Sequence, residues 1–288
     1  MEIQISKPKL LMYWDYELQK AADVSLINKK AWDGYMEYDQ TEKILSLLRK
    51  FRIKNTFAIL GYGAEKGELP YHSPKQIKKI AKLGHEIASH SYNHEYLPDI
   101  SCNQLISTLE KSKKILEKVT GKKVISFVPP YNMPTEYFRF PLALKPRKFS
   151  LSRLNVNNLL RALKDTGYKT CRINKFTPIT NKIFHKFLSY KPIKDDGIMQ
   201  FYLNCSAGFT SEAKQVVSHA IKNNCVAVVY GHPHSTGLKN KQNIKFLESF
   251  LYHVKDLEDE GLIDITTPSE LYNELHKPLN KEIKSKTQ

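Results

Sequence analysis

Two histidines, His90 and His94, stand four residues apart in the segment GHEIASHSYNH, directly after a short apolar run. Side chains at this spacing lie on one face of a helical turn, so both imidazoles can reach the same metal ion. The spacing alone is a weak signal, because paired histidines also occur as exposed or capping residues. Their position after the apolar run, with Ser91 between them, favours a metal site over that alternative.

Two acids, Asp15 and Glu17, follow another apolar run, LLMYW. Carboxylates at the end of an apolar strand lose hydration, which is unfavourable unless they bind or react with something. One of them can complete a site of two histidines and one carboxylate, which leaves positions open for water and substrate. The other can act as a general base on water. The residues themselves do not assign the two roles, and a solvated loop remains the alternative.

Two further apolar runs also end in reactive side chains. Tyr131 follows ISFVPP, and His232 and His234 follow CVAVVYG. A histidine at such a position can protonate a leaving amine, and we favour His232 because it is closer to the end of the run. In parallel β/α barrels the active site forms at the carboxyl ends of the strands. Four such ends with reactive side chains therefore predict one common site.

Apolar segments of strand length alternate with amphipathic segments of helical length along the chain. This alternation predicts a mainly parallel sheet with helical crossovers, and about seven such units predict a closed or nearly closed β/α barrel. Expected strands lie at 10–14, 55–63, 85–90, 124–132, 168–173, 197–203, 225–232 and 262–268, and expected helices at 41–51, 73–84, 102–121, 156–167, 211–223 and 242–259.

The chain is expected to form a single domain over residues 1–275. The segment 133–155 is the least regular and is predicted to be an excursion, and the basic tail 276–288 is predicted to be disordered. Asp39 or Thr41 is the expected N-cap of the 41–51 helix, and Ser73 that of the 73–84 helix.

Composition places the chain among ordinary soluble proteins. It has 288 residues, of which 41% are hydrophobic and 26% charged. The sequence shows neither an apolar segment long enough for a transmembrane helix nor an N-terminal secretory signal, so we expect a cytoplasmic protein. The four cysteines form no C-x-x-C pair, and reduced, buried thiols are expected at Cys102, Cys171, Cys205 and Cys225.

The net charge of +16 is concentrated in one part of the chain. Residues 137–194 contain fourteen Lys and Arg and one acid, Asp165, which gives fourteen minus one, or +13. A solvated lysine-rich surface is one interpretation. The other is peripheral contact with something anionic: a phosphate- or lipid-pyrophosphate-linked substrate, an acidic glycan or the inner membrane leaflet. Nucleic acid is not expected, because the segment contains no recognised binding module.

The order of these motifs resembles a known family. W-D-Y-E, T-F-A-I-L-G, G-H-E-I-A-S-H-S-Y-N-H, F-V-P-P-Y and Y-G-H-P-H follow one another as in the polysaccharide deacetylase (NodB-homology) superfamily, or carbohydrate esterase family 4. The resemblance runs from about residue 10 to residue 271. It implies a distorted (β/α)7-type barrel of mainly parallel strands.

The resemblance also implies a role for each candidate residue. His90 and His94 match the family's metal ligands, usually for Zn²⁺ or another divalent cation. The acidic motif implies Asp15 as general base and Glu17 as third ligand, although these two roles can be exchanged. The backbone N–H of Tyr131 corresponds to an oxyanion donor and His232 to the general acid.

The chain departs from the family pattern at Val128, where the family has an arginine that braces the catalytic base. The later acidic motif that pairs with that arginine is also missing. It is consistent that both are missing, because either charge would be unfavourable if it were buried without its partner. We hypothesise that Arg172, at the end of the next expected strand, supplies the guanidinium to Asp15 instead.

The resulting functional prediction is a metal-dependent deacylase that hydrolyses an N-acetyl or N-formyl amide on a sugar. We expect a cytoplasmic intermediate of surface-glycan biosynthesis as substrate. Two alternatives stay open: a hydrolase of cyclic amides, similar to allantoinases and imidases, and a catalytically impaired relative that binds glycan or metal.

Overall fold

The computed structural model describes residues 1–24, 32–134, 143–144, 149–150, 155–174 and 191–276. Its main feature is a nine-stranded sheet of order β10-β1-β2-β3-β4-β7-β9-β8, in which β11 pairs with the first half of β1. All the neighbouring strands of this sheet run parallel except β8 and β9. The strands are β1 (Lys9–Tyr16), β2 (Thr56–Ile59), β3 (Glu86–Ser89), β4 (Ser126–Phe127), β7 (Thr170–Asn174), β8 (Ile193–Asp195), β9 (Ile198–Leu203), β10 (Val226–Gly231) and β11 (Asp264–Thr266).

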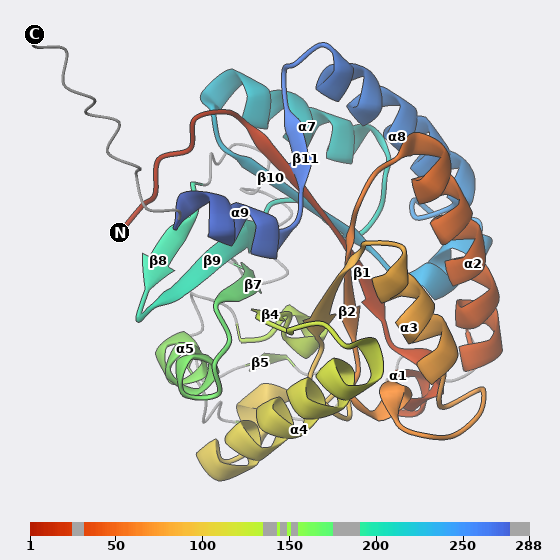
Figure 1. The fold of residues 1–288 in the computed structure, drawn as a ribbon, viewed down its shortest axis with the longest axis vertical. Coiled ribbons are helices and arrows are strands. Elements are labelled where there is room, and N and C mark those ends of the chain that lie inside the picture. The colour runs from red at the N-terminus through yellow and green to blue at the C-terminus, as the bar shows by residue number, and fades with distance from the viewer. Residues whose placement is uncertain (25–31, 135–142, 145–148, 151–154, 175–190, 277–288) are drawn as a thin grey trace, which may run out of the picture.

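The sheet is curled and helices lie around its outside, as Figure 1 shows. This is the predicted distorted β/α barrel in a single domain. The helices are α1 (Leu18–Val24), α2 (Gly34–Phe51), α3 (Pro74–Lys82), α4 (Cys102–Thr120), α5 (Val156–Asp165), α7 (Ser211–Asn223), α8 (Ile244–Asp259) and α9 (Pro268–Leu275). The sequence did not predict α1, β8 or α9. A small hairpin of β5 (Ala143–Leu144) and β6 (Phe149–Ser150) lies apart from the main sheet.

Strand β1 is buried along its whole length, which is usual for a parallel strand covered on both faces. Its even residues from Leu10 to Tyr16 pack in the layer between sheet and helices. Leu11 and Tyr13 pack instead inside the barrel. Because side chains alternate along a strand, Asp15 and Glu17 continue the inner face.

The barrel closes through a side chain beyond the end of β9. Asn204 donates from Nδ2 to the Val226 carbonyl at 3.2 Å and accepts the Val228 N–H on Oδ1 at 2.8 Å. A backbone bond from Gly208 N–H to the Tyr230 carbonyl extends this link to β10. β9 and β10 are thus joined without a regular ladder, which fits the distorted shape of the barrel.

Helix α2 begins seven residues before the predicted start, and the predicted caps are wrong. Asp33 is the N-cap, and its side chain accepts the Met36 N–H. Thr41 lies inside the helix and donates its hydroxyl to the Glu37 carbonyl, while Asp39 is also within the helix. Ser73 does occupy the cap position of α3, but its side chain makes no capping hydrogen bond.

Three of the four cysteines are buried free thiols, and Cys102 is exposed, which corrects the prediction that all four are buried. Most of the predicted excursion at 133–155, and nearly all of the predicted tail at 276–288, fall outside the described residues. Within the described residues, no helix has both the length and the apolar character needed to span a bilayer.

Candidate metal centre and active site

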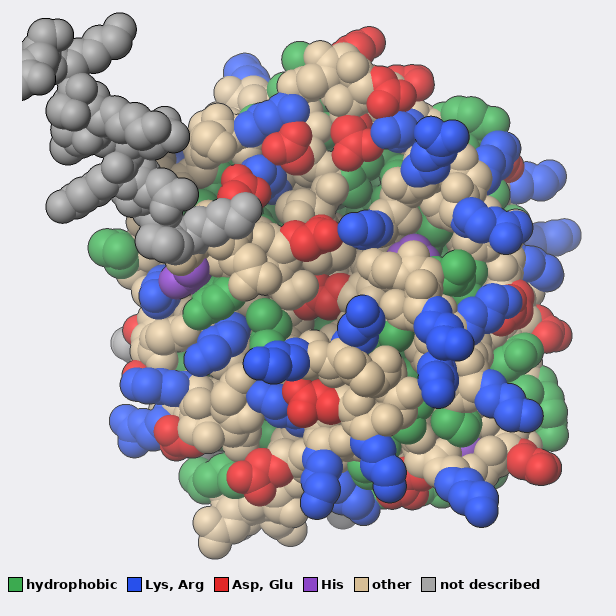
Figure 2. All heavy atoms as spheres, viewed as in Figure 1, with side chains coloured by type: hydrophobic (Ala, Val, Ile, Leu, Met, Phe, Trp, Pro, Cys, Tyr) green, Lys and Arg blue, Asp and Glu red, His purple; other side chains and the backbone are tan. Residues whose placement is uncertain are grey.

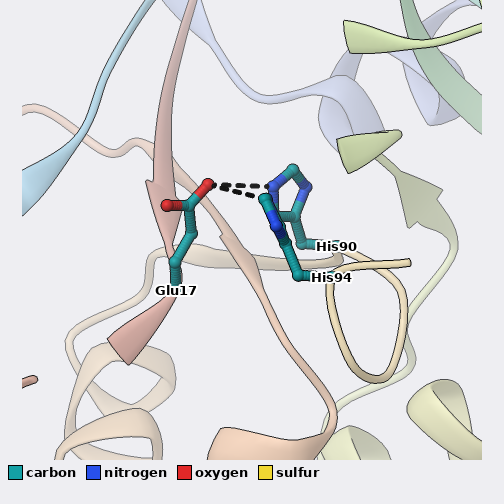
Figure 3. Close-up of side chains that lie close together, drawn as sticks. All are labelled: Glu17, His90 and His94. Carbon is teal, nitrogen blue, oxygen red and sulfur yellow. Dashed lines mark hydrogen bonds and ion pairs between the residues drawn. The ribbon is translucent and has the colours of Figure 1, made fainter. Parts of the chain in front are cut away.

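Three predicted metal ligands meet at the carboxyl ends of β1 and β3. Glu17 Oε1 lies 3.1 Å from His94 Nε2 and 3.4 Å from His90 Nε2. All three side chains are buried, and each offers a ligand atom within 4.8 Å of the other two. Figure 3 shows the carboxylate facing both imidazole rings. The sequence therefore identified a group of side chains that the fold brings together.

The backbone between His90 and His94 is not the helical turn that their spacing suggested. Ser91 and His94 have φ of 67° and 60°, in the left-handed region. The Ser91 carbonyl accepts hydrogen bonds from Ser112 Oγ and the Gly61 N–H, and the Tyr92 N–H donates to Thr108 Oγ1. These contacts to α4 and to the loop after β2 hold an irregular loop that still directs both rings at Glu17.

The ring of His90 is oriented by the backbone directly after β4. Its Nδ1 lies 2.8 Å from the Val128 carbonyl, so Nδ1 carries the proton and Nε2 is left with a lone pair. His90 Nε2 has no hydrogen-bond partner although it is buried, and His94 Nδ1 is in the same state. Buried polar atoms are normally paired.

Electrostatics at Glu17 also favour a cation. Burial acts to raise the pKa of Glu17, but His94 and His90 hold it well below its usual value. A buried carboxylate beside two imidazoles, with the unpaired His90 Nε2 close to it, is a donor set that fits Zn²⁺ or a related divalent ion. The residues present thus fit such an ion, with Glu17, His90 and His94 as its holders.

The carboxylate of Asp15 is paired with Arg172, as the sequence led us to hypothesise. Arg172 comes from β7 and donates two parallel hydrogen bonds to Asp15, of 2.8 Å and 2.7 Å. The guanidinium is fully buried and lies between the rings of Tyr13 and Tyr230, at 5.1 Å and 4.6 Å from their centroids. Burial acts to raise the pKa of Asp15, and Arg172 turns the net shift downward. Asp15 is therefore held as a carboxylate.

The segment that carries Tyr131 is a short turn and not the end of a strand. Predicted strand 124–132 is reduced to β4, because Pro129 and Pro130 have no N–H for a ladder. Tyr131 and Asn132 have φ of 58° and 52° within the 3-10 turn Pro130–Asn132. The Tyr131 ring lies against His94, with centroids 4.4 Å apart.

Asn132 was not predicted, yet it connects this turn to the rest of the site. Its Oδ1 accepts a hydrogen bond from Arg172 at 2.9 Å, and its Nδ2 donates to the Tyr230 hydroxyl at 3.2 Å. One guanidinium therefore binds both the Asp15 carboxylate and the turn that carries Tyr131. The sequence did contain a signal for this turn. Asparagine tolerates a left-handed φ, and one stands directly after P-P-Y.

The two histidines after β10 face different neighbours. His232 is half-buried, and its Nε2 lies 4.0 Å from Asp15 Oδ2. His234 is buried and stacks on Trp32, with centroids 3.9 Å apart and ring planes 4° from parallel. Burial lowers the pKa of His234 to about 4. Both histidines line one pocket together with Asp15, Glu17, Trp32, His94, Tyr131 and Asn132.

Residues 33–143 match the family described as polysaccharide deacetylase. This part of the chain is similar to the polysaccharide deacetylases. The chain is 32% identical over 100 residues to a peptidoglycan-N-acetylglucosamine deacetylase of Bacillus cereus, an alignment that covers 35% of this chain and 34% of that protein. The chain spans about a third of the length of the curated relatives it matches.

Solved structures of the family share the fold. A structure from Mycobacterium smegmatis, assigned to the polysaccharide deacetylases, aligns with a TM-score of 0.64 at 16% identity over 95% of this chain and 93% of that chain. A carbohydrate esterase family 4 pseudoenzyme, solved as a mutant with restored activity, aligns with a TM-score of 0.51 at 15% identity over 93% of this chain and 69% of that chain. At these identities the likeness shows the fold alone.

The matched residues include only part of the site. His90, His94 and Tyr131 lie within 33–143, whereas Asp15, Glu17 and His232 lie outside it. The structure brings all six residues to one pocket or its floor. Their individual roles stay predictions.

Proposed function

We propose that the chain is a metal-dependent deacylase that hydrolyses the N-acetyl or N-formyl amide of a sugar. The observation that carries the proposal is the buried cluster of Glu17, His90 and His94, of which Glu17 and His94 line a pocket that also contains Asp15 and His232. A divalent ion bound by this cluster, with Zn²⁺ as our first choice, would polarise the amide carbonyl and acidify a bound water.

The remaining groups divide the proton transfers between them. Asp15, kept ionised by Arg172, would accept the proton of the attacking water. His232, 4.0 Å from Asp15, would donate a proton to the departing amine. The turn at Tyr131 would place a backbone N–H near the developing oxyanion. His234 is the weaker choice for the acid, because its lowered pKa of about 4 leaves it unprotonated at neutral pH.

The substrate class follows from the relatives. The Bacillus cereus relative is a peptidoglycan-N-acetylglucosamine deacetylase and a Bacillus subtilis relative is a peptidoglycan-N-acetylmuramic acid deacetylase, so these two N-acetylated sugar units are the first substrates to examine. A cytoplasmic intermediate linked to phosphate or lipid pyrophosphate, with peripheral membrane contact, is a finer proposal that rests on the charge of residues 137–194. Much of that segment lies outside the described residues. On the face drawn in Figure 2, basic side chains are spread among acidic ones and form no single patch.

The test combines metal analysis with acyl release on purified full-length protein. Acetate and formate are measured with a panel of N-acyl sugars, and cyclic amides are assayed in parallel. His94→Ala is compared with His72→Ala, a histidine outside the cluster that contacts the Tyr62 carbonyl. We expect metal and acyl release in the wild type and in His72→Ala, and neither in His94→Ala.

Two outcomes would favour the alternatives. Turnover of cyclic amides without acyl release from sugars would indicate an imidase-like enzyme. Bound metal without any turnover would indicate an impaired relative, because fold alone does not determine activity.

A further inference from the structure

Glu37 lies behind the metal cluster and is the least exposed carboxylate near it, with an exposed fraction of 0%. It comes from the first turn of α2, an element that carries none of the predicted site residues. Its Oε1 accepts the Glu17 N–H at 3.1 Å, and its Oε2 accepts the Leu18 N–H at 2.5 Å. Both oxygens are thus used to hold the backbone at Glu17.

The backbone at this point has an unusual conformation. Strand β1 ends at Tyr16, and Leu18 has a φ of 54°, in the left-handed region that side chains disfavour. The turn directs two adjacent N–H groups inward, where a buried donor without a partner is unfavourable. The carboxylate of Glu37 satisfies both donors and stabilises the conformation from which Glu17 projects toward His90 and His94.

The same face of α2 holds the opposite wall of the pocket. Glu37 Oε1 lies 3.8 Å from His234 Nδ1. One turn further along, Gln40 accepts a hydrogen bond from Thr236 Oγ1 at 3.3 Å. Helix α2 therefore connects the Glu17 turn to the Pro233–Gly237 turn, so a shift at Glu37 would move both sides of the pocket.

A glutamine at position 37 could not replace these contacts. A glutamine offers one acceptor oxygen and one amide donor, whereas the two backbone N–H groups need two acceptors. Burying a carboxylate close to Glu17 is electrostatically unfavourable. A residue needed only to fill space in α2 would not need two oxygen atoms placed against the Glu17 and Leu18 N–H groups.

We propose that Glu37 is a positioning residue for the metal centre: it fixes the Glu17–Leu18 turn so that the Glu17 carboxylate meets both imidazoles. The proposal rests on the proposed metal centre and names a residue that acts through Glu17. Mutation of a residue that orients a metal ligand typically weakens metal affinity 10- to 100-fold. We expect an effect of about this size on Zn²⁺ binding.

The experiment compares Glu37→Gln with Glu86→Gln in the full chain. Glu86 is a matched control, because its carboxylate accepts the Ser126 hydroxyl and the Ser269 N–H at 3.0 Å, near the amino ends of the strands. Zn²⁺ dissociation constants are measured by competition with a chromogenic chelator, and stability is measured by urea unfolding of the metal-free proteins. Both variants should unfold at lower urea, and only Glu37→Gln should bind Zn²⁺ about 10- to 100-fold more weakly.

Glu37→Asp keeps two acceptor oxygens on a shorter side chain and should fall between wild type and Glu37→Gln. If Glu37→Gln does not fold, Glu37→Asp tests the positioning role in its place. Wild-type Zn²⁺ affinity in the Glu37 variants, or an equal loss in Glu86→Gln, would overturn the positioning role and leave the metal centre standing. Failure of the wild type to bind Zn²⁺ or any other divalent ion would instead remove the metal centre, and the role of Glu37 with it.

Discussion

Both ends of strand β1 contain buried charge, but the two ends treat it differently. At the amino end, Lys9 has a side chain that is 5% exposed, and its Nζ bonds Asp264 at 3.0 Å and Glu274 at 2.9 Å. Burial acts to lower the pKa of Lys9, and these two acids turn the net shift upward. Every charge in this group has an opposite partner.

At the carboxyl end the pairing is incomplete. Among the described residues, seven buried side-chain polar atoms have no hydrogen-bond partner, and five of them belong to the site or its loop: His90 Nε2, Ser91 Oγ, His94 Nδ1, Arg172 Nε and His234 Nδ1. None belongs to the Lys9 group. Folded proteins usually pair such atoms, and one of the five, His90 Nε2, faces Glu17, where the proposed ion would bind. The charges of the Lys9 group are thus paired, whereas the carboxyl end contains most of the unpaired buried atoms.

The largest expected effect comes from removing an imidazole at the carboxyl end. His90→Ala and His94→Ala should each abolish metal binding and reduce acyl release to background, because two ligands remain where three are needed. The metal-free variants should lose no more than about 1–2 kcal/mol of stability, since few satisfied hydrogen bonds disappear. Metal analysis, acyl-release assays and urea unfolding measure the three quantities. Near-normal metal content and turnover in either variant would refute the ligand assignment.

Arg172→Met should give the largest loss of stability, about 3–5 kcal/mol, because it leaves the buried Asp15 carboxylate without its partner. Acyl release should also be lost. The double variant Asp15→Asn/Arg172→Met removes both charges, so its stability should recover in part while activity stays absent. Urea unfolding of the two single variants and the double variant measures the coupling. If the stability losses of the two single variants added up in the double variant, Asp15 and Arg172 would not be energetically coupled.

Lys9→Met tests the other side of the comparison. It breaks the group with Asp264 and Glu274, whose carboxylates are partly exposed, so we expect a loss of about 1–3 kcal/mol. Metal affinity and acyl release of the folded variant should match the wild type. A large drop in metal affinity would contradict the separation of the two ends.

The parts of the site that follow strands could be predicted from the sequence. Apolar runs mark the strands, their carboxyl ends meet in a barrel, and alternation puts Asp15 on the same face as Leu11 and Tyr13. The placement of Arg172 on Asp15 could also be predicted, since an unpaired buried carboxylate needs a cation.

The supporting residues could not be predicted, for a physical reason. Glu37 lies in an amphipathic helix, where an acid in the first turn is usually an exposed residue that favours the helix dipole. Trp32 and Asn132 act through neighbours that only the tertiary fold brings close. The loop at Ser91 was misjudged because an i, i+4 spacing also fits a non-helical turn in which two residues have positive φ.

The smallest effect concerns pH and a histidine at the amino end. His85 is buried, and its Nδ1 accepts the Asn55 N–H at 3.2 Å. Burial, with a contribution from Lys54, lowers its pKa to about 4 from 6.5. Between these values the unfolded chain binds a proton and the folded chain does not. Stability is therefore lost as pH falls through this window, by up to about 1.4 kcal/mol per pH unit.

His85→Asn keeps an acceptor oxygen for Asn55 and removes the titration. From pH 7 to pH 5, we expect the free energy of unfolding of the wild type to fall by about 1–2 kcal/mol more than that of His85→Asn. Urea unfolding at both pH values measures it, and His276→Asn, an exposed histidine, should show no such change. Zn²⁺ affinity at pH 7 should be unaltered, because His85 lies at the amino end of β3, whereas the metal cluster lies at the carboxyl ends of the strands. If His85→Asn were as acid-sensitive as the wild type, His85 would not be the group that causes this loss of stability.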